Sequence, residues 1–289
     1  MSTGDQIIYL DAPGIRRRYV LHRPTVVHQG TPLPAVIMLD GRGGTPWTAM
    51  KSTGWSALAD DEGFLVAYPE ATRIDPHGPL HFLTNPQMWN AGSGGSDAER
   101  SHVDDVGFLN LLLDDLIQRG ADPARLYMCG FSNGASMTFR FASEIPERLA
   151  ALGTVAGHFR QNQAGHPTRP IPLAHYFGMQ DPISPFHGGL VKLPWGPTEL
   201  RPPARDSAVS WANRNGWSHP PTHEAGEGYY RERWGEPGHP AEVVFTAIED
   251  LGHVWPGGHR LLPEALVGRP SDRLSATREL WAFFSRHSL

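Results

Sequence analysis

The segment from Leu126 to Thr138 constrains the fold of this chain more than any other part of the sequence. It begins with an apolar run of strand character over residues 126–129, passes through Gly130-Phe-Ser-Asn-Gly134, and continues with apolar residues at helical spacing. A GxSxG turn between a strand and a helix lifts a serine hydroxyl above the edge of a sheet. The sequence therefore predicts a strand, a sharp turn and a helix, with Ser132 at the turn.

The two glycines of this turn are expected for two reasons. A Cβ at Gly130 or Gly134 would clash where strand and helix approach each other, and we expect strained backbone angles that suit glycine. The pentapeptide alone is a weak signal in a chain with 32 glycines. Because an ordinary strand-to-helix turn could contain it, its interpretation depends on partner residues elsewhere.

Composition and charge exclude several classes of protein. The 289 residues are 39% hydrophobic and 19% charged, which is typical of a globular chain with a substantial core. The net charge of −5 comes from scattered residues, so we expect no nucleic-acid partner. No apolar run approaches the roughly 18 residues of a membrane span, and residues 1–6 lack the features of a signal peptide. With a single cysteine, Cys129, which we expect to be buried, the sequence predicts a cytoplasmic protein.

Apolar runs and helical patterns alternate along the chain. After an antiparallel hairpin of residues 6–10 and 17–21, we expect strands at residues 35–39, 64–68, 126–129, 150–156, 171–177 and 243–248. Helices are expected at residues 54–61, 104–120, 133–145, 208–213 and 271–287. This alternation predicts one α/β domain, residues 1–289, with a mostly parallel sheet covered on both faces. Long irregular segments are expected at residues 70–100 and 181–240.

Two other features look functional but have simpler interpretations. The glycine-rich loop Asp40-Gly-Arg-Gly-Gly44 follows a strand, yet it matches neither the dinucleotide fingerprint nor the P-loop, so nucleotide binding is not favoured. The paired acids at positions 104–105 and 114–115 could be catalytic carboxylates. A helix cap and a solvated helix face explain them better.

A serine nucleophile needs a base within hydrogen-bond distance and a third group that orients the base. Asp181 follows the strand expected at residues 171–177, and His253 follows the strand expected at residues 243–248. Both lie after Ser132, in the order serine, acid, histidine, with the long insertion of residues 181–240 between the acid and histidine strands. The sequence leaves five rivals for these roles: His158, His175, His187, His259 and Asp250. We expect His175 to pack within its strand, and His187 and His259 could line the pocket.

Hydrolysis through a serine also requires two backbone N–H donors for the oxyanion. Asn133, the residue after the serine, supplies one from the start of its helix. The second is expected from the loop after the strand at residues 35–39, with Arg42 as the candidate.

Several strings resemble one family of enzymes over nearly the whole chain. They include Trp89-Asn-Ala-Gly92, Val103-Asp-Asp-Val-Gly-Phe-Leu109, Gly130-Phe-Ser-Asn-Gly134 and Gly252-His-Val-Trp-Pro-Gly257. The chain resembles the esterases that comprise poly(3-hydroxybutyrate) depolymerases and feruloyl and acetyl xylan esterases. This resemblance implies an α/β-hydrolase fold and a serine esterase without cofactor or metal, with the triad Ser132, Asp181 and His253.

Departures from the family pattern are informative. Where the family usually has His-Gly-Cys-Gly-Gly, this chain has the loop of residues 40–44, so that Arg42 either pairs with Asp40 or reaches the substrate. Ser93-Gly-Gly-Ser96 follows Trp89-Asn-Ala-Gly92 where the family often has cysteines, and Trp217 stands at another such position. The loss of disulfide partners favours a cytoplasmic member acting on a small or oligomeric ester rather than a secreted polymer degrader.

The first functional hypothesis is a serine carboxylic-ester hydrolase that works through an acyl-enzyme. We expect Trp89, Trp195 and Trp255 to form pocket walls that contact the substrate, with ordinary core packing as the alternative for each. An acyltransferase or lactone-forming thioesterase could use the same triad, and a non-catalytic binding protein on this scaffold is a third hypothesis. The sequence predicts no membrane partner and leaves the oligomeric state open.

Overall fold

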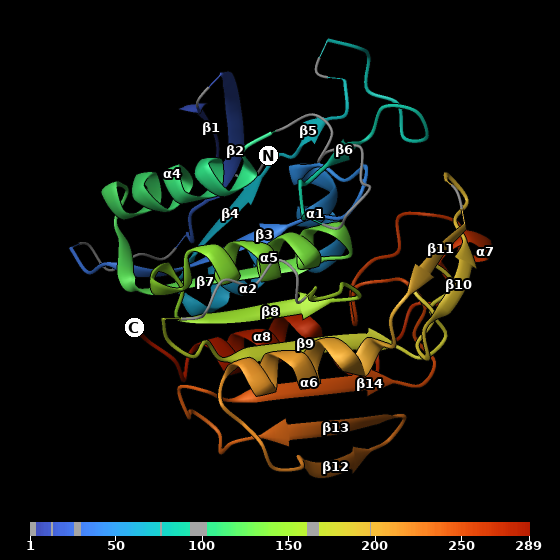
Figure 1. Cartoon of the computed structure of the whole chain (residues 1–289). Coiled ribbons are helices and arrows are strands. Elements are labelled where there is room, and N and C mark those ends of the chain that lie inside the picture. Colours follow the sequence, from blue (N-terminus) through green and yellow to red (C-terminus); the bar gives the residue numbers. More distant parts are fainter. Residues whose placement is uncertain are drawn as a thin grey trace.

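The structure of the protein is a computed structural model that describes residues 4–12, 14–25, 30–75, 77–92, 103–160, 168–196 and 198–289. A ten-stranded sheet crosses the molecule in the order β1-β2-β4-β3-β7-β8-β9-β14-β13-β12 (Figure 1). Its strands are β1 (Asp5–Ala12), β2 (Ile15–His22), β3 (Leu33–Leu39), β4 (Leu65–Pro69), β7 (Ala121–Phe131), β8 (Ala151–Val155), β9 (Leu173–Gly178), β12 (Thr222–Gly226), β13 (Tyr229–Trp234) and β14 (Val243–Ile248). Two separate pairs are β5 (Thr72–Arg73) with β6 (Gln87–Met88) and β10 (Gly189–Lys192) with β11 (Thr198–Arg201).

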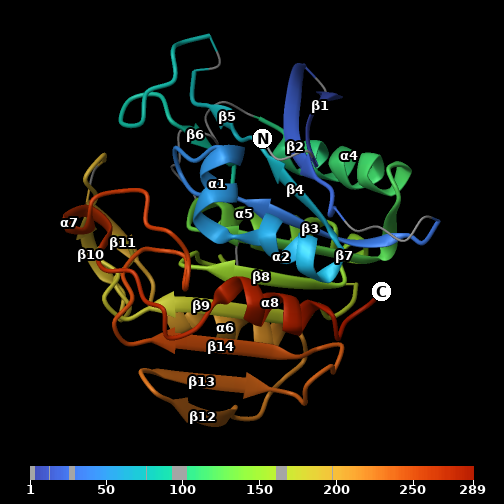
Figure 2. The same cartoon turned by 180° about the vertical axis from the view of Figure 1, so that it is seen from behind.

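Helices cover both faces of this sheet. They are α1 (Pro46–Thr53), α2 (Trp55–Glu62), α4 (Asp105–Gln118), α5 (Asn133–Glu144), α6 (Ala204–Arg214), α7 (Glu264–Val267) and α8 (Ala276–Phe284), with a 3-10 turn at Pro146–Arg148. Helices α4, α5 and α6 pack one face in one hydrophobic cluster, while α1, α2 and α8 pack the opposite face in another (Figures 1 and 2). The predicted mostly parallel sheet with two covered faces is confirmed.

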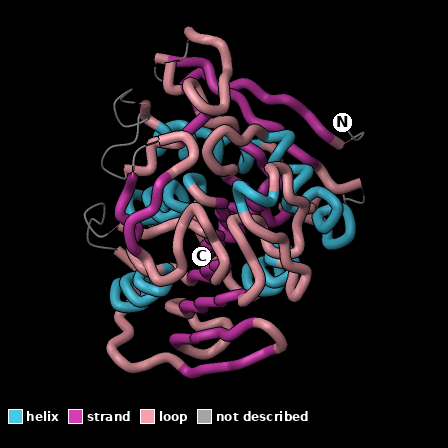
Figure 3. The backbone as a smooth tube through the Cα atoms, turned by 90° about the vertical axis from the view of Figure 1, so that its right-hand side faces the viewer, coloured by secondary structure: helices cyan, strands magenta, loops and turns pink. Residues whose placement is uncertain are grey.

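The central strands of the sheet are parallel, and the helices that connect them cover both faces. Strands β4, β3, β7, β8, β9 and β14 pair in parallel, and every residue of β8 and of β14 is buried. Such strands are continuous apolar runs, which is why the sequence reveals them. Their carboxyl ends reach one side of the molecule, and loops cover most of that side (Figure 3).

The two ends of the sheet are antiparallel. The predicted hairpin at the N-terminus is present as β1 and β2, and β2 pairs antiparallel with β4. At the other end, β13 pairs antiparallel with both β14 and β12.

The segment of residues 181–240 is more ordered than the sequence predicts. It contains the hairpin β10–β11, a helix that starts at Ala204 rather than at residue 208, and the two edge strands β12 and β13. The edge strands were missed because they are rich in charged and polar residues, as edge strands commonly are. Helix α1 was also missed, although Thr45 closes a capping box at its start. The last helix begins at Ala276, after the cap Ser275, and not at residue 271.

The acids at the start of α4 have different environments. Asp104 caps the helix by accepting a hydrogen bond from the Gly107 N–H, as expected. Asp105 is buried and forms an ion pair with Arg17 at 2.8 Å, so this residue is not the cap of the helix, the role that the sequence left open for it. Cys129 is buried, as expected.

Part of the predicted loop at residues 70–100, including Ser93 and Ser96, lies outside the described residues. Its described part contains the short pair β5–β6. Among the described residues, every helix is too short or too polar to cross a membrane.

Candidate active site

Ser132 lies at the turn between β7 and α5, in the position that the sequence predicts. Its backbone has φ 53° and ψ −117°, an uncommon conformation for a residue with a side chain. Backbone strain of this kind is typical of a nucleophile at a strand-to-helix turn. The turn therefore presents the hydroxyl at the carboxyl end of the central strand.

The neighbouring glycines are required for space. A Cβ on Gly130 would lie 2.3 Å from the Gly134 carbonyl oxygen, and a Cβ on Gly134 would lie 2.2 Å from the carbonyl oxygen of Leu39. The predicted clash is confirmed. The predicted backbone strain at the glycines is wrong, because the positive φ belongs to Ser132 instead.

The structure brings the three predicted side chains together. The hydroxyl of Ser132 lies 2.9 Å from Nε2 of His253, and Nδ1 of His253 lies 2.7 Å from Oδ2 of Asp181. An ionised carboxylate only accepts hydrogen bonds, so Nδ1 carries the proton and donates it to Asp181. Nε2 is then free to accept the proton of the serine hydroxyl, which is the arrangement that general-base catalysis requires.

Neighbouring parallel strands position the acid and the base. Asp181 follows β9 and His253 follows β14, and these two strands are adjacent in the sheet. Two backbone N–H groups, those of Ile183 and Ser184, donate to Oδ1 of Asp181 at 2.8 and 2.7 Å. The carboxylate is therefore oriented on one oxygen by the backbone and on the other by the imidazole. Asp181 and His253 are both buried.

Two of the rival histidines are structural. Nδ1 of His175 lies 2.8 Å from Oγ1 of Thr154, and Nε2 of His158 lies 2.6 Å from Oγ of Ser184. Burial lowers the pKa of His175 to about 4 and the pKa of His158 to about 3. Both imidazoles are therefore neutral at pH 7 and lie within the protein interior. The packing expected for His175 is confirmed.

The remaining rivals lie elsewhere. Asp250 contacts the guanidinium of Arg273 at 3.3 Å, away from the imidazole of His253. His259 lines the cavity next to Ser132, whereas His187 is exposed. Within the described ranges, no three His, Cys, Asp or Glu side chains come together in a way that could hold a metal ion.

The predicted oxyanion donors belong to two segments that meet at Ser132. Asn133 is the first residue of α5, where backbone N–H groups have no partner within the helix. The loop of residues 40–44 follows β3, and a Cβ on Gly41 would lie 3.2 Å from the Cβ of Ser132. Arg42 is the next residue of this loop and lines the same cavity as Ser132. The donor roles of Asn133 and Arg42 stay predictions.

Asp40 stabilises the loop in which it lies. Its carboxylate accepts hydrogen bonds from the Gly41 N–H at 2.8 Å and from Oγ1 of Thr48 at 2.6 Å. Desolvation by the surrounding protein raises the pKa of Asp40. The guanidinium of Arg42 donates to the carbonyl oxygens of Phe82, at 2.6 Å, and Leu83, at 3.2 Å. Arg42 therefore joins the loop of residues 40–44 to the loop of residues 80–85.

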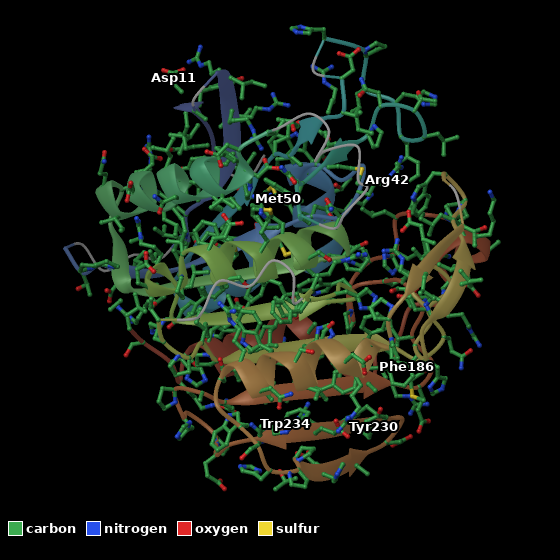
Figure 4. All side chains as sticks on the ribbon, viewed as in Figure 1. Asp11, Arg42, Met50, Phe186, Tyr230 and Trp234 are labelled. Carbon is green, nitrogen blue, oxygen red and sulfur yellow. The ribbon has the colours of Figure 1, made fainter. Side chains whose placement is uncertain are left out.

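A cavity of about 260 Å³ opens next to Ser132 and His253. Trp195 and Phe82 form an edge-to-face pair at its wall, with ring centroids 5.8 Å apart. The guanidinium carbon of Arg42 lies 5.2 Å from the centroid of the Trp195 ring, and Figure 4 labels Arg42 on the side of the molecule to which the parallel strands point. The segments that contain Phe82 and Trp195 therefore meet at this wall.

The other two tryptophans differ from Trp195. Trp255 lines the cavity, but its side chain is buried and its indole N–H donates to Oγ1 of Thr277 at 2.9 Å. Trp89 is not among the described residues that line the cavity, and only 1% of it is exposed. Its indole N–H donates to the carbonyl oxygen of Asp40 at 3.0 Å. The expectation that Trp89 forms a pocket wall is therefore not met, because the ring packs in the core behind the loop.

Comparison with known proteins shows what this chain resembles in sequence and in fold. No protein-family model matches the chain. NocK of Nocardia uniformis subsp. tsuyamanensis, provisionally named an esterase, is 28% identical over 281 residues, which cover 91% of this chain and 77% of NocK. Feruloyl esterase B of Piromyces equi is 27% identical over 175 residues, which cover 59% of this chain and 30% of that protein. The solved structure of acetyl xylan esterase from Aspergillus awamori has a TM-score of 0.64 and 15% identity, over 97% of this chain and 99% of that one.

The structural likeness extends over both chains almost completely, and the sequence relatives carry esterase names. The chain has the α/β-hydrolase fold, and its sequence is similar to those of esterases. The fold class and the resemblance to esterases that the sequence predicts are both confirmed. Because the chain spans only 30% of the length of feruloyl esterase B, the substrate in that name does not transfer to it directly.

Proposed function

We propose that this protein hydrolyses carboxylic esters through an acyl-enzyme on Ser132, with His253 as the general base and Asp181 as the group that orients it. One observation carries the proposal. A continuous line of hydrogen bonds, 2.9 and 2.7 Å long, runs from the strained Ser132 through His253 to Asp181. This arrangement matches the roles of nucleophile, base and orienting acid.

The reaction has two similar halves. As Oγ of Ser132 attacks the ester carbonyl, Nε2 of His253 takes the hydroxyl proton, and the C–O bond to the alcohol then breaks. The imidazolium returns the proton to the departing alcohol. Water enters, gives a proton to the imidazole and attacks the acyl-enzyme. The C–Oγ bond then breaks, the imidazolium donates its proton to Oγ of Ser132, and the carboxylic acid is released. Asp181 stabilises the imidazolium in both halves.

The negative charge of each tetrahedral intermediate needs two donors. The backbone N–H of Asn133 and that of Arg42 are the proposed pair, one from the start of α5 and one from the loop after β3. Loss of one such donor costs about 2.7 to 4 kcal/mol in the activation barrier. Because the donors belong to the backbone, substitution of the Arg42 side chain leaves this stabilisation in place.

The cavity supports a small or oligomeric ester with an aromatic or short acyl group. Phe82, Phe131 and Trp195 supply flat apolar walls next to the serine. The names of the relatives point to esters of the same kinds, feruloyl for one and acetyl xylan for another. No feature of the site favours acyl transfer or lactone formation over attack by water, so hydrolysis is the proposed second step.

Turnover of a panel of esters tests the proposal. The panel comprises p-nitrophenyl esters from acetyl to octanoyl, together with feruloyl and 3-hydroxybutyryl esters. The wild type should hydrolyse at least one of them, and Ser132→Ala should lose that activity. Ser143→Ala is the matched control, because Ser143 lies in the helix that follows Ser132 and its hydroxyl donates to the carbonyl oxygen of Phe139 at 2.8 Å. A wild type without activity, or a fully active Ser132→Ala variant, contradicts the proposal.

A further inference from the structure

Trp89 connects the two segments that supply the proposed oxyanion donors. Its indole N–H donates to the carbonyl oxygen of Asp40 at 3.0 Å. Its backbone N–H donates to Oδ1 of Asn133 at 2.7 Å, and the Asn133 amide donates back to the Trp89 carbonyl oxygen at 3.1 Å. One residue is thus hydrogen-bonded both to the loop after β3 and to the first residue of α5.

We propose that Trp89 is a positioning residue of the oxyanion site. Trp89 fixes the position of the loop of residues 40–44 relative to the start of α5. This inference rests on the proposed function. The stabilisation of an oxyanion depends on donors that are fixed in advance at about 2.7 to 3.1 Å from the oxygen. A residue that sets the distance between two donors therefore affects the transition state more than the bound substrate.

The loop of residues 40–44 packs closely against the start of α5 at the carbonyl group of Asp40. A Cβ on Gly134 would lie 2.5 Å from the carbonyl oxygen of Asp40, the same oxygen that accepts the indole N–H of Trp89. This carbonyl belongs to the peptide unit that joins Asp40 to Gly41. The indole bond to this carbonyl and the bond from the Gly41 N–H to the Asp40 carboxylate together orient the peptide unit, from which the backbone continues to Arg42.

Hydrogen bonds also hold Asn90, the residue that follows Trp89. The Asn90 N–H donates to Oδ2 of Asp105 at 2.7 Å, and the Asn90 carbonyl oxygen accepts a hydrogen bond from Arg140 at 2.5 Å. Asp105 in turn forms its buried ion pair with Arg17 of β2. The segment from which Trp89 contacts the site is therefore held by hydrogen bonds to buried residues.

The matched control for Trp89 is Trp211. Both side chains are buried, and both indole N–H groups donate to a backbone carbonyl oxygen at 3.0 Å, that of Asp40 for Trp89 and that of Ile171 for Trp211. Trp89→Phe and Trp211→Phe each remove one indole N–H and keep an aromatic ring. The two substitutions should lower the thermal midpoint by similar amounts, so that a difference in catalysis reports on position rather than on stability.

The experiment measures kcat, KM and the inhibition constant of phenylboronic acid, which forms a tetrahedral adduct with a reactive serine. For Trp89→Phe we expect kcat to fall about tenfold and the boronic acid to bind about tenfold more weakly, with KM within about twofold of the wild type. The pH dependence of kcat should not change, since the contacts of His253 are intact. Trp211→Phe should leave kcat and inhibitor binding within about twofold of the wild type.

A second variant keeps the test decisive if Trp89→Phe does not fold. Asn133→Ala retains the backbone N–H and removes both side-chain bonds to Trp89, so it should produce the same fall in kcat and in boronic acid affinity. Unchanged values in the variants that fold, an equal loss in Trp211→Phe, or a loss confined to KM overturns the inference. A wild type that hydrolyses no ester overturns the proposed function itself. This result differs from those that overturn only the role of Trp89, because they require an active wild type.

Discussion

The hydroxyl of Ser132 lies 2.9 Å from Nε2 of His253, although 121 positions separate the two residues in the sequence. The sheet produces this approach because β7 and β14 are parallel strands that end on the same side of the molecule, with β8 and β9 between them. Each residue follows the carboxyl end of its strand, the usual place for a site in an α/β protein. The contact is therefore a property of the sheet topology.

Asp181→Asn should lower kcat on the order of 10³- to 10⁴-fold. The amide N–H₂ cannot accept the proton that Nδ1 of His253 now donates, so the imidazole favours the tautomer that cannot act as a base for Ser132. Steady-state kinetics with the best ester of the panel measure this loss. Asp250→Asn is the control, because Asp250 contacts Arg273 rather than the imidazole, and its kcat should stay within about twofold. Equal effects of the two substitutions would exclude Asp181 as the orienting acid.

Trp195→Ala should impair the hydrolysis of aromatic esters selectively. The substitution removes the edge-to-face pair with Phe82 and one wall of the cavity. An aromatic pair contributes about 0.5 to 1.5 kcal/mol, so kcat/KM for a feruloyl ester should fall about two- to tenfold, while the value for an acetyl ester stays nearly constant. Leu190→Ala, in β10 of the hairpin whose connection contains Trp195, is 75% exposed and should change neither. A parallel loss for both esters in Trp195→Ala would contradict this role.

The buried ion pair between Arg17 and Asp105 should be costly to break. Arg17→Leu leaves the Asp105 carboxylate buried without its cation, and we expect the free energy of unfolding to fall by about 3 to 5 kcal/mol. The double variant with Asp105→Leu should recover part of this loss. Arg16→Leu removes an exposed pair with Asp11, and its effect should be within about 0.5 kcal/mol. Urea denaturation measures all three, and equal effects of the single substitutions would show that burial does not matter here.

Acid should destabilise the protein through His175. Burial lowers the pKa of His175 to about 4, whereas an unfolded histidine titrates near 6.5. As the pH falls from about 6.5 to about 4, the unfolded state gains the proton that the folded state excludes, so stability is lost over this range. The loss from this residue is on the order of 3 kcal/mol.

The measurement is urea denaturation at several pH values between 7 and 4. His175→Phe retains a ring among the neighbouring aromatic side chains and removes the titrating group, so its stability should depend less on pH than that of the wild type. His223→Phe alters an exposed histidine and should leave the wild-type slope unchanged. A His175→Phe variant with the wild-type slope would contradict the assignment.

The sequence predicted those parts of the fold that a local pattern of residues determines. Buried parallel strands such as β14 are apolar throughout, so even their ends could be predicted, and Asp181 and His253 could be recognised because each follows such a strand. Gly130 and Gly134 were predicted for the right steric reason. Strands β12 and β13 were missed because a charged edge strand lacks the apolar pattern.

Long-range partners could not be predicted in this way. The sequence shows that Trp89 is large and apolar, but only the structure shows that its indole faces Asp40 in the core rather than a substrate in the cavity. Likewise, Asp105 looks like a helix-cap residue in the sequence, and its partner Arg17 lies in a distant hairpin. Neither position carries a local signal that distinguishes a core role from a surface or site role.

The most direct test of the central claim is to label the protein with a fluorophosphonate and to map the modified peptide by mass spectrometry. A serine that His253 activates should form one phosphonyl adduct, on the peptide that contains Ser132, and Ser132→Ala should abolish it. A wild type that stays unlabelled, or an adduct that persists in Ser132→Ala, would contradict the assignment of Ser132 as the nucleophile.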